Sequence, residues 1–477
     1  MCTIIQNSVQ RYDYFFISAN NYYKTFVYVI KKHYLCAMNR QILRLAIPSI
    51  LANITIPLVG LVDTAIVGHI SDAYAIGGIA IGTMLFDLLY WNFGFLRVGT
   101  SGMTAQAFGR GDREGCARLF TQSVGIALIG SAIIWTLQWV FVTCVLYFVP
   151  CSPEVDAFAR EYFFIRVWAA PATLSLMAIK GWFIGMQDTI SPMITDIVVN
   201  VINMAVSYAL AVYTPVGALG VAYGTVVAQL TGLLLSVVIL LVKYRNVWQG
   251  LSFNQLLRDM RGIGLLMSLN ANLFIRSLCF MIVYVGFTAL SSKYGDTDLA
   301  VCSILMKLFM LVSYFVDGFA YAGEAIVGKF IGEAKSSLVS RLLPLASVVR
   351  PLFVWSLGVG AIFTAVFALA YMPMYRAMTS DAIVLARLTD FTGWLIAMPI
   401  VSTLAFMWDG VYAGATAGKQ IRNAMIWAAI GFVVGYWLAP VAWGTHVLFV
   451  GYFLHLIARV VYLTVNWNPL VLRIMSR

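Results

Sequence analysis

Long apolar stretches dominate the chain, and they restrict what it can fold into. Of its 477 residues, 61% are hydrophobic and only 11% are charged, and the mean hydropathy is +0.87. Soluble domains are about 25% charged, whereas a helix of about 20 apolar residues can cross a bilayer. The sequence therefore predicts an all-α polytopic membrane protein whose surroundings are the lipid bilayer.

Twelve stretches are long enough to span a membrane. They cover residues 42–67, 75–103, 121–149, 159–184, 191–213, 216–242, 262–290, 298–328, 345–371, 383–416, 421–442 and 446–468. Several exceed the length that spanning requires, so tilted or extended helices are expected. Most links between them are short, and only 243–261 and 329–344 are long enough to form surface helices.

Residues 1–37 do not fit this pattern. They are rich in Tyr, Phe and Asn, and the basic residues Lys31 and Lys32 follow their apolar stretch, which is the wrong order for a signal peptide. We interpret 1–37 as an N-terminal extension. Either Met38 is the natural start of the protein, or the extension is a loose cytoplasmic segment.

Basic residues outnumber acidic ones by 31 to 20, and their positions indicate the topology. With an even number of spans and a cytoplasmic N-terminus, most Lys and Arg fall on one face, Arg459 among them. The opposite face receives only Arg160, Lys293, Arg376 and Arg387. Cytoplasmic loops carry such an excess. We therefore expect a cell (inner) membrane protein with both termini in the cytoplasm and no nucleic-acid partner.

The two halves of the chain resemble each other. Glycine and proline positions of the second and fourth stretches recur 224 to 229 residues later, in the eighth and tenth. The matched pairs are Gly94 and Gly318, Gly99 and Gly323, Pro171 and Pro399, Gly181 and Gly410, and Gly185 and Gly414. We expect two pseudo-symmetric six-helix lobes with a pathway between them: an N-lobe of 38–242, a cytoplasmic linker of 243–261 and a C-lobe of 262–477.

One carboxylate stands alone in the first stretch. Asp63 is the only charged residue between Arg44 and His69. An ionised carboxylate in hydrocarbon is costly unless it is protonated, paired or facing a polar cavity, so Asp63 is a candidate site for a proton or a cation. The alternative is a carboxyl that neighbours hold neutral for packing. Pro48 and Pro57 in the same stretch lack backbone donors and make the helix bendable.

Further ionisable residues lie in the second half, and we group them as a C-lobe polar cluster: Arg276, Asp317, Glu324 and Asp409. Asp317 and Glu324 are seven residues apart and share one helix face. Such groups either pair or line water. One hypothesis is that Arg276 holds one acid ionised while another meets substrate or ion; the alternative is a purely structural ion pair.

The remaining charged residues within or beside the predicted spans are assigned structural roles or no role. Lys180 is expected to reach toward the cytoplasmic surface, and Asp188 and Asp196 to cap the fifth helix. Asp87, Arg97 and Lys307 have no assigned role.

Known catalytic and cofactor motifs are missing from the sequence. It contains no GxxxxGK[ST] nucleotide loop, no HExxH and no GxSxG. The seven cysteines have neither metal-ligand nor redox spacing. We expect no enzyme activity, no catalytic residues, no metal and no cofactor.

Several long motifs resemble the multidrug and toxic compound extrusion (MATE) family, in its DinF-like branch. The first is Ala46–His69 (AIPSILANITIPLVGLVDTAIVGH), and the second is Phe95–Gly109 (FLRVGTSGMTAQAFG). Shorter ones follow in family order: Gly217–Thr225, Phe274–Ser277, Asp317–Ala325 and Trp408–Thr416. The resemblance covers roughly residues 40–470.

The resemblance implies alternating access between two lobes, with export of amphipathic, often cationic compounds driven by inward proton or sodium flow. Asp63 matches the ion-coupling carboxylate, Pro48 the hinge of the first helix, and Asn203 and Thr225 polar positions of the N-lobe cavity. Some family members carry a second acid where this chain has Ser207. The absence of this second carboxylate weakens a sodium site in the N-lobe and favours proton coupling through Asp63. We expect a monomer. The alternative function is a lipid-linked oligosaccharide flippase of the same architecture.

Overall fold

The computed structural model describes residues 38–69, 73–149, 151–249, 259, 261–334 and 345–475. The predicted extension 1–37 and most of the predicted linker 243–261 lie outside these ranges. Within them, twelve helical segments are long and apolar enough to cross a membrane. The predicted all-α fold with twelve transmembrane helices is therefore confirmed.

The spans follow one another in chain order. They are the first span (Met38–His69), α2 (Ala73–Tyr90) with α3 (Phe95–Gly109), α4 (Arg113–Phe148), α5 (Pro153–Arg166) with α6 (Ala170–Gly185), α7 (Ile190–Tyr213), α8 (Gly220–Lys243), α11 (Ile263–Ser291), α12 (Asp296–Ala334), α14 (Ala346–Met378), α16 (Thr392–Gly414), α17 (Gly418–Leu438) and α18 (His446–Val465). Three short helices accompany them: α9 (Arg245–Trp248), α15 (Ala382–Asp390) and α19 (Trp467–Met475).

Two N-lobe spans are interrupted. The second has a 3-10 turn, Trp91–Phe93, between α2 and α3, and the fourth has another, Val167–Ala169, just before Pro171. The predicted stretch 383–416 is also not one helix. It divides at Phe391 into α15 and α16, so only its second part spans.

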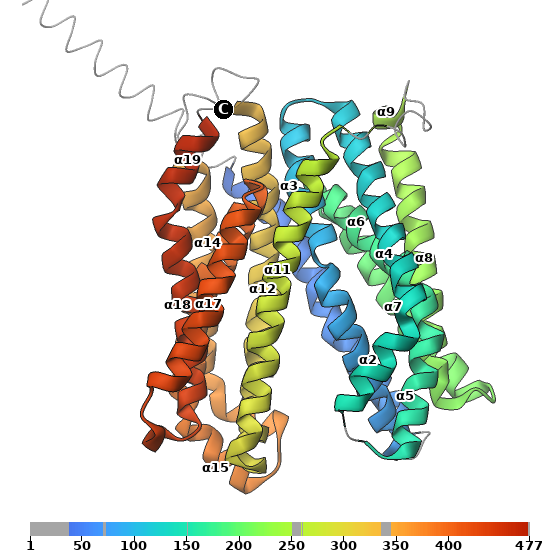
Figure 1. Ribbon diagram of the computed structural model, residues 1–477, viewed down its shortest axis with the longest axis vertical. Coiled ribbons are helices and arrows are strands. Elements are labelled where there is room, and N and C mark those ends of the chain that lie inside the picture. Colours follow the sequence, from blue (N-terminus) through green and yellow to red (C-terminus); the bar gives the residue numbers. More distant parts are fainter. Residues whose placement is uncertain are drawn as a thin grey trace, which may run out of the picture.

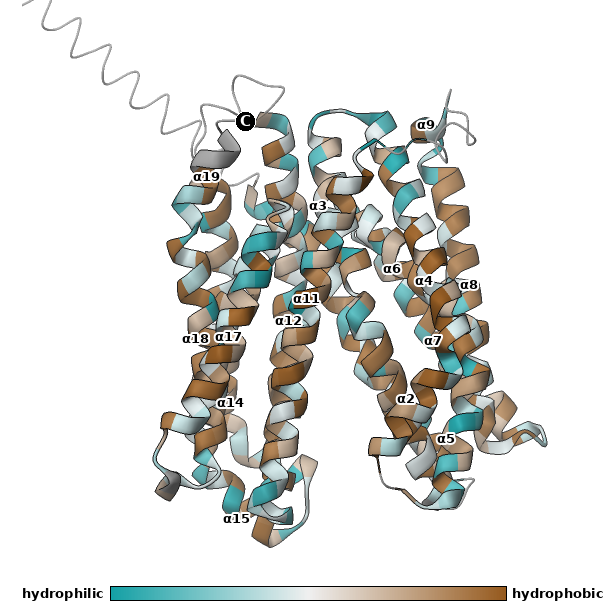
Figure 2. Ribbon diagram, viewed as in Figure 1, coloured by the Kyte–Doolittle hydropathy of each residue, from teal (hydrophilic) through white to brown (hydrophobic). Residues whose placement is uncertain are grey.

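The helices form two bundles (Figure 1). These lie together at the end that carries the C-terminus and α9, and they diverge toward the end that carries α15 and the start of α5. Hydrophobic residues run along the length of the helices, while hydrophilic ones gather toward the ends (Figure 2). Large apolar side chains such as Trp139, Leu234, Ile282 and Val354 are exposed, as expected of surfaces that face lipid.

The packing repeats between the two lobes. In the N-lobe, a Cβ atom at Gly181 of α6 would overlap the backbone of Arg97 on α3; in the C-lobe, one at Gly410 of α16 would overlap the backbone of Ala320 on α12. Only glycine permits these close approaches. The repeat predicted from the sequence thus has the same packing in both lobes.

The first span packs against both lobes. Its first residues, including Met38 and Leu45, belong to a buried cluster with Leu352 of α14 and Met407 of α16. Its last residues, Ile66 and Val67, belong to the N-lobe core. This helix therefore connects the two bundles, and Pro48, Pro57 and Asp63 lie between its two anchored ends.

Candidate functional site

Asp63 occupies the part of the first span that joins the N-lobe core. Its side chain is half-buried, and its Oδ1 atom is buried without a hydrogen-bond partner among the residues that the structure describes. Buried carboxylate oxygens are normally hydrogen-bonded, and an exception needs an explanation. An oxygen in this state is available to a proton or a cation.

Pro48 lies near the other end of the same helix. The first span is helical throughout Met38–His69, including both prolines. Pro48 has no N–H to donate to the carbonyl of Arg44, four residues earlier. That carbonyl instead accepts a hydrogen bond from the Thr189 hydroxyl at 3.4 Å. Thr189, in the link between α6 and α7, therefore supplies the hydrogen bond to this carbonyl that the proline cannot donate.

The two predicted N-lobe polar residues bond to each other. Asn203 of α7 donates through Nδ2 to Oγ1 of Thr225 on α8, at 3.0 Å, and both side chains are buried. The Oδ1 atom of Asn203 has no partner in the described part of the chain. Ser207, one turn further on, is fully buried against Gly224, where even a Cβ atom would overlap its hydroxyl. The tight contact explains why a small residue occupies this position.

The predicted C-lobe cluster contains two separate groups. In the first, Asp409 of α16 accepts a hydrogen bond from Nη2 of Arg276 on α11 at 2.7 Å, and another from Nε of Arg459 on α18 at 3.0 Å. Arg459 is 1% exposed. The expectation that Arg459 lies at the cytoplasmic surface is therefore wrong: a carboxylate inside the lobe holds it.

Asp317 differs from Asp409. It is half-buried on α12, and no described basic group is close enough to form an ion pair with it, although the charges of Arg97 and Arg276 act on it. One acid of the cluster is thus held by two arginines while another is left without an ion pair.

Glu324 forms the second group, and its partner is in the other lobe. It is 2% exposed and accepts a hydrogen bond at 3.2 Å from Nη1 of Arg97, on α3. The guanidinium of Arg97 also lies over the ring of Tyr321, 4.1 Å from its centroid. Glu324 is therefore part of an interlobe contact, and Arg97, which had no assigned role, is its partner.

Lys180 and Asp196 pair with each other across α6 and α7. Lys180 is therefore held by an acid of the neighbouring helix. Asp196 lies inside α7 and not at its start, so the expectation that it caps this helix is wrong. Asp188 does cap α7: its Oδ1 accepts from the backbone N–H of Ser191 at 3.1 Å. It also accepts from Nζ of Lys243 at 2.7 Å.

The lobes are joined where α3 and α6 meet α12 and α16. Nε2 of Gln106 donates to the carbonyl oxygen of Gly414 at 3.0 Å, and Nε2 of Gln187 donates to that of Ala325 at 2.7 Å. Cβ atoms at Gly109 or Gly332 would overlap backbone atoms of the opposite lobe. This end is therefore closed by direct backbone contact.

Aromatic residues also meet between the lobes. Trp91 lies 5.4 Å from Tyr284 and 6.1 Å from Phe280, and Phe95 lies 6.3 Å from Phe274, all as ring-centroid distances. The first member of each pair precedes or begins α3, and the others belong to α11. Aromatic rings of the N-lobe therefore pack against those of the C-lobe.

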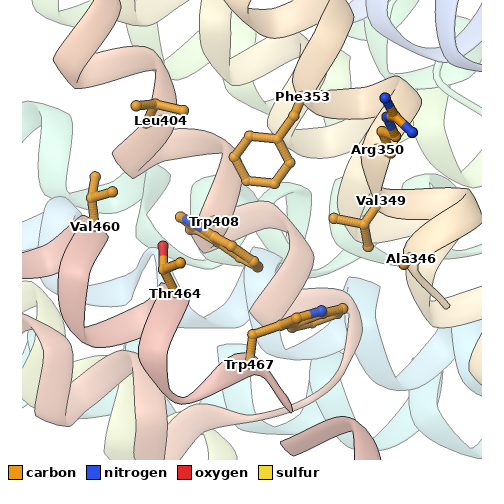
Figure 3. A pocket seen from close by; sticks show the side chains of 9 residues that line it. All are labelled: Ala346, Val349, Arg350, Phe353, Leu404, Trp408, Val460, Thr464 and Trp467. Carbon is orange, nitrogen blue, oxygen red and sulfur yellow. The ribbon is translucent and has the colours of Figure 1, made fainter.

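A pocket of about 420 Å³ lies between α14, α16, α18 and α19 of the C-lobe (Figure 3). Its centre is Trp408, whose ring lies 4.8 Å from that of Phe353 and 5.3 Å from that of Trp467. It contains none of the site residues that the sequence predicted. Two of the helices that line it, α16 and α18, also carry Asp409 and Arg459.

Comparisons with known proteins agree with the two-lobe arrangement. The MatE family model matches residues 48–209 and 273–441, one segment in each lobe. The chain is 31% identical to the DNA damage-inducible protein F of Escherichia coli (strain K12) over 445 residues, which cover 93% of this chain and 95% of that protein.

Two further matches extend the likeness. A probable multidrug resistance protein NorM of Rhizobium meliloti (strain 1021) is 26% identical over 90% of this chain and 92% of its own length. A crystal structure of MATE in complex with MaL6 has a TM-score of 0.80 at 17% identity, covering 92% of this chain and 97% of that one. The structural match shows the fold.

MATE proteins are transporters and not enzymes; they need no cofactor and use an ion gradient to carry small molecules across the membrane. None of these matches supports the flippase alternative. Because the family model matches more than half of the chain, and a relative above 30% identity covers nearly all of it, this multi-pass membrane protein belongs to the MATE family of multidrug and toxic compound efflux transporters.

Proposed function

We propose that this protein exports amphipathic organic cations in exchange for protons, by alternating access between its two lobes. The observation that carries the proposal is the Asp63 carboxyl group, with a buried oxygen that lacks a hydrogen-bond partner in the described structure. Burial favours the protonated form of a carboxyl group. A group that can hold a proton in one state of the transporter and lose it in another can couple proton flow to a conformational change.

A proton fits this site better than sodium. A sodium ion needs several oxygen ligands, and the position where some family members have a second acid is Ser207 in this chain. Its tight contact with Gly224 leaves no space for a longer side chain. A single carboxylate is sufficient for a proton.

The substrate class follows from charge and aromatic content between the lobes. Asp317, without an ion-pair partner among the described residues, offers a negative charge. The aromatic pairs around Trp91 and Phe95 offer π faces that attract cations and pack against apolar rings. A flat, hydrophobic organic cation satisfies both features.

We further propose that the closed end faces the cytoplasm, with both termini on that side. The loops and helix ends there carry basic residues, including Arg110, Lys243, Lys419 and Arg422, in accord with the positive-inside rule. The diverging end then faces outward. In this state substrate leaves and Asp63 takes up an external proton; return to the inward-facing state releases that proton and admits new substrate.

The test uses purified protein in liposomes with ethidium as the organic cation. A pH gradient alone should drive ethidium movement, and a sodium gradient alone should not. Asp63→Asn should abolish the proton-driven transport, whereas Asp390→Asn, which changes an exposed acid near the end of α15, should leave it unchanged. Wild-type rates in Asp63→Asn would overturn the role of Asp63, and sodium-driven transport by the wild type would overturn proton coupling.

A further inference from the structure

The pocket around Trp408 is a groove with mostly apolar walls (Figure 3). α14 and α18 pack on either side of α16 and make little contact with each other, so α16 forms the floor of the groove. Trp408 of α16 is 8% exposed, and the rings of Phe353 and Trp467 lie against it. The volume of about 420 Å³ falls in the range of about 300 to 1,000 Å³ that is typical of small-molecule sites. The pocket therefore suits the apolar part of a ligand.

The pocket can be reached from the bilayer. On α14 and α18, the residues next to its lining are exposed and apolar: Val354 is 63% exposed, Val461 53% and Val465 69%. Ala346 and Trp467, the first residues of α14 and α19, both line the pocket. It therefore lies at the closed end, which carries α19 (Figure 1), and near the level of the lipid headgroups of one leaflet.

Arg350 gives this apolar pocket a positive charge. It is the only charged residue among the described residues that line the pocket, it is exposed, and Figure 3 shows it at the edge of the group. Its side chain forms no ion pair or hydrogen bond with any residue that the structure describes. Arg276 and Arg459, in contrast, are both held by Asp409.

The start of α14 adds to this positive charge. The N-terminal end of a helix carries a partial positive charge, which acidic side chains usually balance. The first turn of α14 contains no acidic residue, and Leu345 before it has no side chain that could cap the helix. Arg350 is the fifth residue of this helix, so two positive charges reinforce each other beside the pocket. An anion is therefore the complementary group.

We propose that this pocket binds one anionic phospholipid of the leaflet at the closed end. The phosphate group contacts Arg350, and one acyl chain lies along Phe353, Trp408 and Trp467. A guanidinium binds phosphate oxygens through two parallel hydrogen bonds, and basic pockets between transmembrane helices bind anionic headgroups. The acyl chain is surrounded by apolar groups both in the bilayer and in the pocket, so the headgroup charge decides which lipid is bound.

Other occupants fit less well. An organic cation would bring a second positive charge next to Arg350. A second copy of the chain would have to cover Arg350 with an acid, and the described lining of the pocket offers none. Both remain outcomes of the experiment.

The experiment measures lipid binding to the purified, delipidated full-length protein by native mass spectrometry. Dioleoyl phosphatidylglycerol and dioleoyl phosphatidylcholine have the same acyl chains and differ in net charge. The wild type should bind one phosphatidylglycerol about fivefold more tightly than phosphatidylcholine, the factor expected for one basic residue near a membrane surface. Arg350→Gln should abolish this preference, and Arg350→Lys should keep part of it.

Two further variants separate charge from shape. Arg376→Gln changes another exposed arginine of α14, in its last turn, and should keep the wild-type preference. Val460→Phe places a larger side chain in the pocket and should weaken the binding of both lipids while keeping Arg350. Because Arg350 is exposed and unpaired in the described structure, Arg350→Gln should melt at the wild-type temperature when no lipid is present.

Each alternative outcome would overturn the proposal. A wild type that binds the two lipids equally, or an Arg350→Gln variant that keeps the full preference, would show that Arg350 holds no headgroup. An equal loss in Arg376→Gln would show that only the general surface charge matters. Displacement of bound phosphatidylglycerol by ethidium would assign the pocket to organic cations. A dimer that Val460→Phe dissociates would make it an interface between copies of the chain.

Discussion

Arg97 and Glu324 form an ion pair at 3.2 Å that connects the two lobes. Glu324 is almost completely buried, and its second carboxylate oxygen has no partner in the described part of the structure. Because Arg97 belongs to α3 and Glu324 to α12, this contact must change when the lobes separate at their closed end. The ion pair is therefore part of the energy difference between the two states of the transporter.

We predict that Glu324→Gln destabilises the closed end. A hydrogen bond to a charged group contributes about 1.5 to 3 kcal/mol, which corresponds to a tenfold or larger change in a population ratio. Spin labels at Glu154 and Thr379, at the diverging end, should report a shift toward shorter distances. The exchange Arg97→Glu with Glu324→Arg should restore the wild-type distribution. Unchanged distances in Glu324→Gln would contradict the prediction.

Asp317 and Asp409 should respond differently to loss of charge. Asp409→Asn leaves Arg276 and Arg459 without their carboxylate, so unfolding in detergent should become easier by about 3 to 5 kcal/mol. Asp317→Asn breaks no ion pair in the described structure and should leave the melting temperature unchanged while lowering ethidium transport. Normal transport by Asp317→Asn, or wild-type stability of Asp409→Asn, would show that the two roles are assigned wrongly.

Much of the fold could be predicted from the sequence, because membrane spans are determined by local composition. The twelve spans depend on runs of apolar residues, and the repeat depends on glycines such as Gly181 and Gly410, which lie at equivalent helix contacts. The division of 383–416 into two helices was not predicted, since the break at Phe391 has no proline or glycine signal at that residue.

The site was harder to predict, because charge pairing depends on helices far apart in the sequence. The sequence pattern places Arg459 at the cytoplasmic end, whereas in the structure it donates a hydrogen bond to Asp409. Glu324 was predicted as a member of the C-lobe polar cluster, but its partner Arg97 belongs to the other lobe and lies 227 residues away in the sequence. Sequence spacing identifies residues on one helix face but not the helix that they meet.

Pro48→Ala should slow transport without weakening the fold. The substitution restores an N–H that can bond to the carbonyl of Arg44, and replacing proline in a helix interior can stabilise it by up to about 3 kcal/mol. The stiffer first span would resist the bending that alternating access requires. Initial rates of ethidium transport and the melting temperature measure the two effects.

Thr189→Val tests the same backbone carbonyl, that of Arg44, because it removes the hydroxyl that donates a hydrogen bond to it. It should leave that carbonyl without a partner and lower the melting temperature, while keeping the proline. If Pro48→Ala transports at the wild-type rate, Pro48 is not a hinge.

We predict that Asp188 makes part of the folding stability depend on pH. Burial alone would raise the pKa of this carboxyl, but hydrogen bonds from Lys243, Ser191 and Tyr244 outweigh burial and hold the pKa below its usual range. The stabilisation is therefore present above the unfolded pKa of about 3.8 and is lost as the pH falls through the lower, folded value. Asp188→Asn should lower the melting temperature at pH 7, and the difference from wild type should shrink below about pH 4.

The exposed cap Asp381 of α15 gives the comparison for this prediction. Asp381→Asn removes an N-terminal cap without breaking a contact between helices, so its effect at pH 7 should be smaller. A difference between Asp188→Asn and wild type that does not change with pH would contradict the prediction.

Gln106 and Gln187 should act together as the polar part of the closed end. Each donates to a backbone carbonyl of the opposite lobe, and a neutral hydrogen bond contributes about 0.5 to 1.5 kcal/mol. The double variant Gln106→Ala, Gln187→Ala should therefore open this end more often and raise hydrogen exchange in residues 102–109 and 325–334, with smaller effects in each single variant. Gln138→Ala, on α4, is the control and should leave these segments unchanged. If the double variant exchanges like the wild type, the glycine contacts alone keep the lobes closed.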